Sequence, residues 1–156
     1  MLIVVDSREP VTTAWFRDLE HVRRALPCGD YSIVGGELLV GIERKAVPDL
    51  LACVGRERER FERMLSRWAT SGVRWRWLVV EGSLDEIEIE TMRAIHGRRV
   101  TVSHVVGSLR SWAMRFGIVP WLARSPVDAE RFAWSVLGAV ERRIRAAAAT
   151  SSSATA

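Results

Sequence analysis

The chain has 156 residues, 48% of them hydrophobic, with seven tryptophans, a net charge of +4 and an isoelectric point of about 10. These values predict one folded domain with a sizeable buried core and exclude a disordered chain. No run is apolar enough to cross a membrane, and Met1 leads directly into Leu-Ile-Val-Val without the basic start of a signal peptide, so we expect a cytoplasmic location. The charge is compatible with a phosphate-backbone partner, although a GC-rich genome also yields an arginine-rich chain.

The cysteines are Cys28 and Cys53, and no CxxC or Cys/His spacing accompanies them. We therefore expect free thiols in a reducing compartment rather than a disulfide or a zinc site. The compact chain and its Arg- and Ala-rich composition suggest a prokaryotic or phage-encoded protein.

The N-terminal segment is predicted to form a strand followed by a helix. Leu2 to Asp6 is a short apolar run, and Pro10 prevents it from continuing in a sheet. Thr12 or Thr13 can cap a helix that runs to about Leu26. Its apolar face would consist of Trp15, Phe16, Leu19 and Val22.

The stretch from Cys28 to Asp49 predicts a hairpin. Residues 31–34 and 37–42 are β-prone, and Gly35-Gly36 between them is typical of a two-residue turn. Antiparallel pairing would place Asp30 at the entrance beside residues 43–45 at the exit. Two carboxylates next to an ammonium group suit a hard divalent cation and an anionic substrate. The ammonium group belongs to the only lysine in the chain.

The rest of the chain alternates between predicted helices and strands. Asp49 would cap a short helical turn, and residues 56–69 predict a helix with Phe61, Met64, Leu65 and Trp68 on its apolar face. The later expectations are a strand at 75–81, an ambiguous segment at 84–100, a helix from Ser103 to Gly117, a strand at 118–122, and a last helix opened by Ser125 and Pro126. This order predicts an α/β fold, a mixed central sheet flanked by helices.

A family resemblance rests on two blocks of residues. Gly29-Asp30, followed by Glu43-Arg44-Lys45 and Asp49, resembles the GD…ERKxxxD signature of the XPF-type (ERCC4-domain) structure-specific endonucleases. Val5-Asp6-Ser7-Arg8-Glu9 resembles the other block of that family, a strand that ends in DxRE. The resemblance implies a restriction-endonuclease-like core of the PD-(D/E)xK group over residues 1–145, with 146–156 as a low-complexity, frayed tail.

Phosphodiester cleavage requires a metal held by carboxylates and a cation that offsets the developing negative charge. By this logic Asp30 and Glu43 are the first-choice ligands of Mg²⁺ or Mn²⁺. The resemblance adds Asp6, Glu9 and the backbone carbonyl of the ERK arginine. Lys45 would orient the attacking water and stabilise the phosphorane.

Three further residues, Arg44, Asp49 and Glu81, complete the candidate site. Arg44 is grouped with the catalytic residues by its place in the motif, and an ion pair with Asp49 is the contact expected of it. Asp49 is otherwise only a helix cap. Glu81, at the end of its predicted strand, either supports the site or caps the segment that follows.

Arginines are the candidate DNA contacts. The resemblance points to Arg60, and Arg8, Arg56 and Arg63 complete the set. A solvated helix face is the alternative, because pairs such as Glu59–Arg63 have i,i+4 spacing. We expect flap, fork or otherwise branched DNA as the partner.

The resemblance also implies a homodimer or heterodimer through the nuclease domain. Trp134 lies off the apolar stripe of its predicted helix, which suggests packing on a partner. XPF-type proteins usually carry a helix-hairpin-helix module that helps to choose the junction, and the sequence shows none, which leaves the choice of junction open. Two alternatives remain. One is a non-catalytic DNA-binding or dimerisation subunit of the same fold. The other is an RNA-binding module, for which Trp75-Arg76-Trp77 is the one hint.

Overall fold

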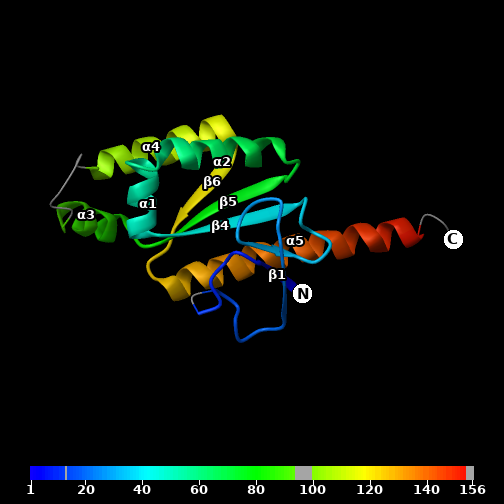
Figure 1. The fold of residues 1–156 in the computed structure, drawn as a ribbon. Coiled ribbons are helices and arrows are strands. Elements are labelled where there is room, and N and C mark those ends of the chain that lie inside the picture. Colours follow the sequence, from blue (N-terminus) through cyan, green and yellow to red (C-terminus); the bar gives the residue numbers. More distant parts are fainter. Residues whose placement is uncertain (13, 94–99, 154–156) are drawn as a thin grey trace.

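The computed structural model describes residues 1–12, 14–93 and 100–153, which form a mixed sheet between two helical layers (Figure 1). The strands of this part are β1 (Ile3–Asp6), β2 (His21–Arg24), β3 (Tyr31–Ile33), β4 (Val40–Ala46), β5 (Trp75–Glu81) and β6 (Ile118–Leu122). The helices are α1 (Val47–Val54), α2 (Arg58–Thr70), α3 (Leu84–Arg93), α4 (Val102–Phe116) and α5 (Pro126–Ser153).

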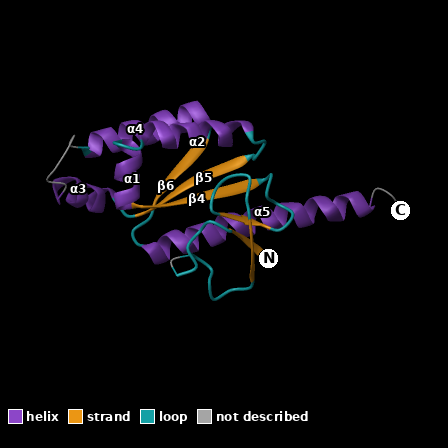
Figure 2. Ribbon diagram, viewed as in Figure 1, coloured by secondary structure: helices purple, strands orange, loops and turns teal. Residues whose placement is uncertain are grey.

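The strand order is β2-β1-β3-β4-β5-β6. The central β4 is antiparallel to β3 and parallel to β5, which in turn is parallel to β6. Helices α2 and α4 cover one face and α5 crosses the other (Figure 2). The predicted α/β architecture with a mixed sheet is confirmed.

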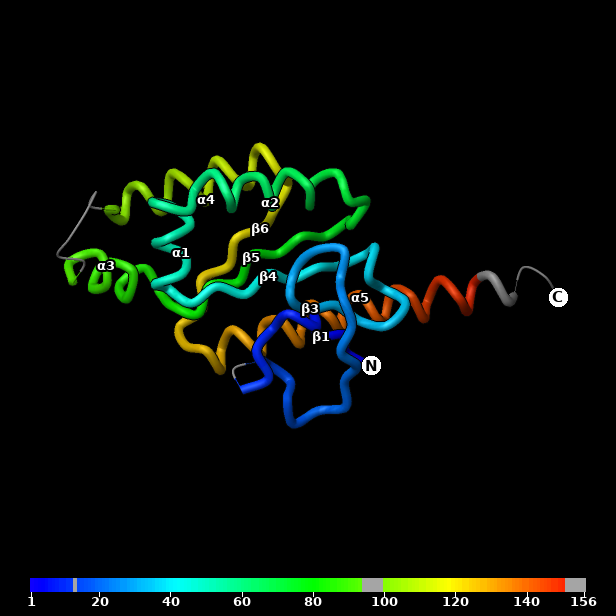
Figure 3. The backbone as a smooth tube through the Cα atoms, viewed as in Figure 1, coloured from blue at the N-terminus to red at the C-terminus, as the bar shows by residue number. Residues whose placement is uncertain are grey.

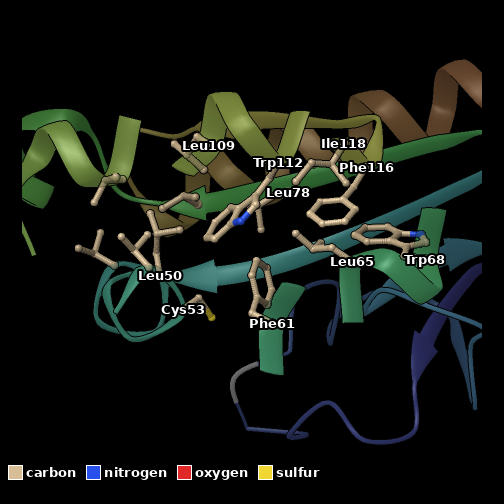
Figure 4. Close-up of a cluster of buried hydrophobic side chains, with 14 of the residues drawn as sticks. Leu50, Cys53, Phe61, Leu65, Trp68, Leu78, Leu109, Trp112, Phe116 and Ile118 are labelled. Atoms are coloured by element: carbon tan, nitrogen blue, oxygen red, sulfur yellow. The ribbon is translucent and has the colours of Figure 1, made fainter. Parts of the chain in front are cut away.

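Two apolar clusters lie on opposite faces of the sheet. The first joins α1, α2 and α4 to β5 and β6, and its largest buried side chains are Trp68 and Trp112 (Figure 4). The predicted apolar face of α2 is confirmed, because Phe61, Leu65 and Trp68 are buried there. The second cluster packs α5 against β1, β3 and β4.

The helix predicted from residue 12 to about 26 is wrong. Turns replace its first part, and β2 replaces its last part, parallel to β1. The tube of Figure 3 shows no helical coil in the described part of this blue N-terminal stretch. Phe16 has a φ of +61°, which a right-handed helix excludes, and its N–H donates to Glu130 of α5 at 2.7 Å. Trp15 stacks on Tyr31 at 5.0 Å between ring centroids. These tertiary contacts outweigh local helix propensity. Thr13 lies outside the described residues.

The hairpin is present, but the predicted two-residue turn is wrong. The connection runs from Val34 to Leu39, and Gly35 alone of the two glycines has a positive φ, +78°. Both turn positions would need positive φ in a tight turn. The loop is held by N–H groups of Leu39 and Val40 that donate to the Gly36 carbonyl. The pairing nevertheless matches Tyr31 with Ile42, so the entrance and the exit do lie side by side.

The second half of the chain largely follows expectation. Strands β5 and β6 have the predicted bounds, and the ambiguous segment from residue 84 to 93 is helix α3; residues 94–99 lie outside the described part. Thr101 rather than Ser103 caps α4, in a box with His104, and Gly117 ends it at φ +62°. The segment expected to fray from Ala146 is helical to Ser153. No helix in the described ranges is long and apolar enough to cross a membrane.

Gly29 offers a test of how the motif backbone is fixed. It has a φ of +76°, and a Cβ there would lie 2.9 Å from the carbonyl oxygen of Ile42 in β4. Gly72 has a similar φ of +82° but open space around a Cβ. We expect Gly72→Ala to lower the free energy of unfolding by about 1 kcal/mol and Gly29→Ala by about 3 kcal/mol. Urea denaturation of both variants measures this, and equal losses would refute the contact with Ile42.

Candidate active site

Strand β4 sends alternate side chains to opposite faces of the sheet. Glu43 and Lys45 point to the face of α1 and α2, since their ladder partners Leu78 and Val80 belong to that apolar cluster. The ammonium nitrogen of Lys45 lies 2.5 Å from Glu43 Oε1 and 3.2 Å from the carbonyl oxygen of Arg44. It also lies 5.6 Å from the centre of the Phe61 ring. The Lys45 ammonium group therefore contacts two of the oxygens that were predicted to bind a metal, one from Glu43 and one from the Arg44 carbonyl.

Asp30 reaches the same place from the entrance of β3. Its backbone N–H donates to the Ile42 carbonyl at 2.7 Å, and its Oδ2 accepts from the backbone N–H of Arg44 at 2.8 Å. Burial, followed by the nearby charge of Glu43, raises the pKa of Asp30 to about 8. The sequence brought Asp30 and Glu43 together by the hairpin argument, and the structure confirms that they interact. We call these two residues the carboxylate pair.

Lys45 offsets part of the negative charge of this pair. Burial lowers its pKa, but the charges of Glu43 and Asp30 outweigh burial and raise the pKa above the usual value for lysine. The ammonium group is therefore charged at neutral pH. Two carboxylates against one ammonium group leave one negative charge when all three are ionised, which favours an additional cation.

Asp6 lies next to this site but is fully engaged. Its Oδ1 accepts from the backbone N–H and Nε of Arg8 at 2.8 and 2.7 Å, and its Oδ2 accepts from Arg8 Nη2 and the Leu26 N–H. Burial raises the pKa of Asp6, but these donors together lower it below the usual range. Arg8 itself is exposed and interacts electrostatically with Asp30 and Glu43. Asp6 thus holds the guanidinium group of Arg8 beside the site.

Glu9 lies on a second network, formed with Arg44. Arg44 Nη1 donates to Glu9 Oε1 at 2.8 Å, and the hydroxyl of Tyr31 donates to the same oxygen at 3.0 Å. Arg44 also holds Glu81 through two hydrogen bonds of 2.9 and 3.0 Å, and Trp15 Nε1 donates to Glu81 at 2.7 Å. Arg44 points away from Glu43 and Lys45 because it occupies the intervening position on β4.

This network corrects one expectation and explains another. Arg44 pairs with Glu9 and Glu81 rather than with Asp49, which is exposed in the first turn of α1. Ala46 is the N-cap of that helix, so Asp49 as a cap is wrong. Pro48 at the start of α1 sets this boundary, and an acidic residue in the first turn suits the positive end of the helix dipole.

The four predicted metal ligands are not gathered into one cluster. Among the residues that the structure describes, no group of three or more His, Cys, Asp or Glu side chains is placed to hold a metal ion. The carboxylate pair with the Arg44 carbonyl still fits Mg²⁺, which proteins usually bind through one or two carboxylates while water and substrate phosphate complete the shell. Burial and then the charge of Glu43 raise the pKa of Asp30, and a divalent cation bound beside it would favour the ionised carboxylate.

The predicted DNA contacts on α2 and in the turn before it are exposed but paired. Arg56 and Arg60 lie near Glu57 at 3.8 and 3.1 Å, and Arg63 lies 3.7 Å from Glu59, the pair expected from its spacing. Exposed pairs of this kind are weak and are easily exchanged for a phosphate. Arg60 and Arg63 lie on α2, the helix that carries Phe61 over Lys45, and Arg56 lies in the turn before it, so all three can flank the site.

Sequence reasoning missed the part played by Trp15 and Tyr31. It assigned Trp15 to a helix face and Tyr31 to a strand, and only the fold brings both to Glu9 and Glu81. The two aromatic rings and two carboxylates surround the guanidinium group of Arg44. The one feature of the sequence that pointed to this network was Glu81, a charged residue at the end of an otherwise apolar predicted strand.

The Arg44 network makes a stability prediction. Arg44→Met leaves two largely buried carboxylates without their cation, so we expect a loss of about 3 kcal/mol in the free energy of unfolding. Adding Glu81→Gln should recover part of that loss, because one uncompensated charge is removed. Chemical denaturation of the single and double variants provides the measurement. A double variant less stable than Arg44→Met would contradict this account.

Comparison with known proteins agrees with this geometry. The fold matches XPF from Aeropyrum pernix with a TM-score of 0.67 at 20% identity, over 94% of this chain and 68% of that one. XPF from Aeropyrum pernix in complex with DNA matches with a TM-score of 0.65 at 20% identity, over 91% of this chain and 66% of that one. No curated protein matches the sequence. The ERCC4 domain model matches residues 5–133, and the chain therefore belongs to the ERCC4-domain family.

Proposed function

We propose that this protein is a divalent-metal-dependent endonuclease that hydrolyses phosphodiester bonds in DNA. The observation that carries the proposal is the convergence of Asp30, Glu43 and Lys45 near the carboxyl end of the central strand β4. Membership of the ERCC4-domain family supports the same chemistry. The only lysine of the chain lies beside the carboxylate pair, and a catalytic role for Lys45 accounts for that position.

In this proposal Asp30, Glu43 and the Arg44 carbonyl hold Mg²⁺ or Mn²⁺. The metal would polarise the scissile phosphate and lower the pKa of an attacking water. Lys45 now donates to two of these three groups, so it is placed to move toward a phosphate oxygen when a metal takes its position. There it would orient the water and offset the charge of the phosphorane.

The surrounding residues position this site in the proposal. Arg8, fixed by Asp6, presents an exposed guanidinium group beside the carboxylate pair and would contact a neighbouring phosphate. Arg44 anchors its own peptide group from behind, because its side chain is held by Glu9 and Glu81. Its N–H holds Asp30, so the rear network sets the position of a catalytic carboxylate.

DNA with a flap, a fork or another branch is the proposed substrate. The Aeropyrum pernix XPF that shares this fold has been solved with DNA, which supports DNA as the partner. The exposed Arg60 and Arg63 on α2, with Arg56 just before that helix, would follow its backbone. The alternative, a non-catalytic subunit of the same fold, is less well supported because Asp30, Glu43 and Lys45 are all present, Lys45 contacts Glu43, and Asp30 accepts from the N–H of Arg44 between them.

Cleavage of labelled 3′-flap, fork and linear duplex DNA tests the proposal. With Mg²⁺ or Mn²⁺ we expect wild-type protein to cut branched DNA, and Asp30→Asn or Lys45→Met to lower kcat by about 100-fold or more. Asp18→Asn is the matched control, since this exposed carboxylate pairs only with the neighbouring Arg17 among the described residues and its loss should not change the rate. DNA binding without cutting by wild-type protein would favour the non-catalytic subunit.

The proposal includes a homodimer. Strand β6 is an edge of the sheet and exposes Val119 and Trp121, while Trp134 on α5 remains 43% exposed although its ring lies 6.1 Å from Phe16. Exposed apolar side chains on a sheet edge favour pairing with another chain.

Sedimentation equilibrium tests the dimer. We expect twice the chain mass for wild-type protein and a shift toward the monomer for Val119→Glu, because a charge would be buried at the proposed interface. Val11→Glu, at another exposed valine, should leave the mass unchanged. A monomeric wild-type protein at about 50 μM would refute the dimer as an obligate state.

A further inference from the structure

Two arginines share one tryptophan ring at the end of β5 remote from the carboxylate pair. The guanidinium carbon of Arg74 lies 4.9 Å from the centre of the Trp75 ring, and that of Arg143 lies 5.4 Å from it. Arg74 immediately precedes β5 and Arg143 lies on α5, so residues far apart in sequence build the arrangement. We call these three residues the Trp75 cluster.

The cluster has a positive charge that no carboxylate balances. Within the described ranges, neither Arg74 nor Arg143 lies within ion-pair distance of Asp or Glu. Glu141, the nearest carboxylate along α5, already pairs with Arg145 at 2.9 Å. Two like charges beside one ring repel each other, and the ring face offsets this only in part. A phosphate group would remove the imbalance.

The backbone fixes the cluster in an accessible position. The Arg74 N–H donates to the Leu38 carbonyl at 3.0 Å, and the N–H of Trp75 donates to Leu39 at 2.8 Å. In the ladder with β6, pairing begins at Arg76, so β6 does not extend to Trp75. Both arginine side chains are exposed, and the indole is partly exposed. The backbone beside the cluster is therefore fixed, and its guanidinium groups are open to a ligand from solvent.

The Trp75 cluster is separate from the proposed catalytic site at Asp30, Glu43 and Lys45. The ladder partner of Lys45 is Val80, five residues along β5 from Trp75, which corresponds to roughly 17 Å along the strand. Trp75 also faces α5, whereas Lys45 faces α1 and α2. One phosphate cannot contact both places, so a ligand of the cluster belongs to another part of the substrate or to another segment.

We propose that the Trp75 cluster is a second nucleic-acid contact, which binds the phosphate backbone of a DNA segment remote from the cleaved bond. This inference rests on the proposed function and adds to it. Charge complementarity selects the occupant, because a DNA backbone supplies closely spaced phosphates to two fixed guanidinium groups. The proposed DNA contacts Arg56, Arg60 and Arg63 have glutamate partners, so DNA must displace those carboxylates there but not at the cluster.

Binding of fluorescently labelled single-stranded, duplex and forked DNA, measured by anisotropy over a range of salt concentrations, tests the inference. The variant is Arg74→Gln/Arg143→Gln, and the matched control is Arg110→Gln/Arg131→Gln, which removes the same charge from exposed arginines elsewhere. We expect the cluster variant to weaken binding about tenfold and to reduce the slope of log K against log salt by about 1 to 2. The control should bind as wild type does.

Cleavage kinetics separate this inference from the proposed function. The cluster variant should raise KM and leave kcat unchanged, because the cluster contacts no reacting atom. Unchanged binding and salt slope, or an equal loss in the control, would overturn the inference even if wild-type protein cuts DNA. A change in molecular mass without a change in DNA binding would identify the cluster as a protein interface and also overturn it. Wild-type protein that neither binds nor cuts DNA would refute the proposed function and this inference together.

Discussion

The strict alternation of side chains along β4 is the constraint on which the site depends. Glu43 and Lys45 face the helices α1 and α2, and Arg44 between them faces the opposite side. A shift of one residue in register would exchange these faces and place the lysine among the carboxylates that now hold Arg44. The apolar partners of β4 on each face make such a shift costly, because both clusters would be disrupted.

Charge is arranged differently on the two sides of this strand. Behind the strand, Arg44 satisfies Glu9 and Glu81 through good hydrogen bonds, so the network stabilises the local fold. In front, Asp30 and Glu43 crowd each other, and Lys45 offsets only part of their charge. A fully paired network of charges next to a group with unbalanced charge is the arrangement expected where surrounding residues position a reactive site. The peptide group of Arg44 connects the two, since its N–H holds Asp30.

The predictions from sequence succeeded where local pattern and final structure agree. The period of α2 identified its buried face, and the apolar run at 75–81 gave the bounds of β5. The N-terminal helix failed because Trp15 and Phe16 are buried by partners more than ten residues away, and propensity contains no information on such contacts. The Arg44–Asp49 pair failed for a similar reason. Glu81 reaches Arg44 across the β4–β5 ladder, which sequence separation does not reveal.

The sequence alone determined the α/β pattern, the hairpin and the meeting of Asp30 with Glu43 and Lys45, because all of these follow from short-range spacing and strand pairing. Only the tertiary structure decided what each remaining charge contacts. Asp6 accepts hydrogen bonds from Arg8, and Glu9 and Glu81 accept them from Arg44. Arg143 of α5 packs against the ring of Trp75 in β5. Such partners come from elements that the fold brings together over long sequence distances, and no local period encodes them.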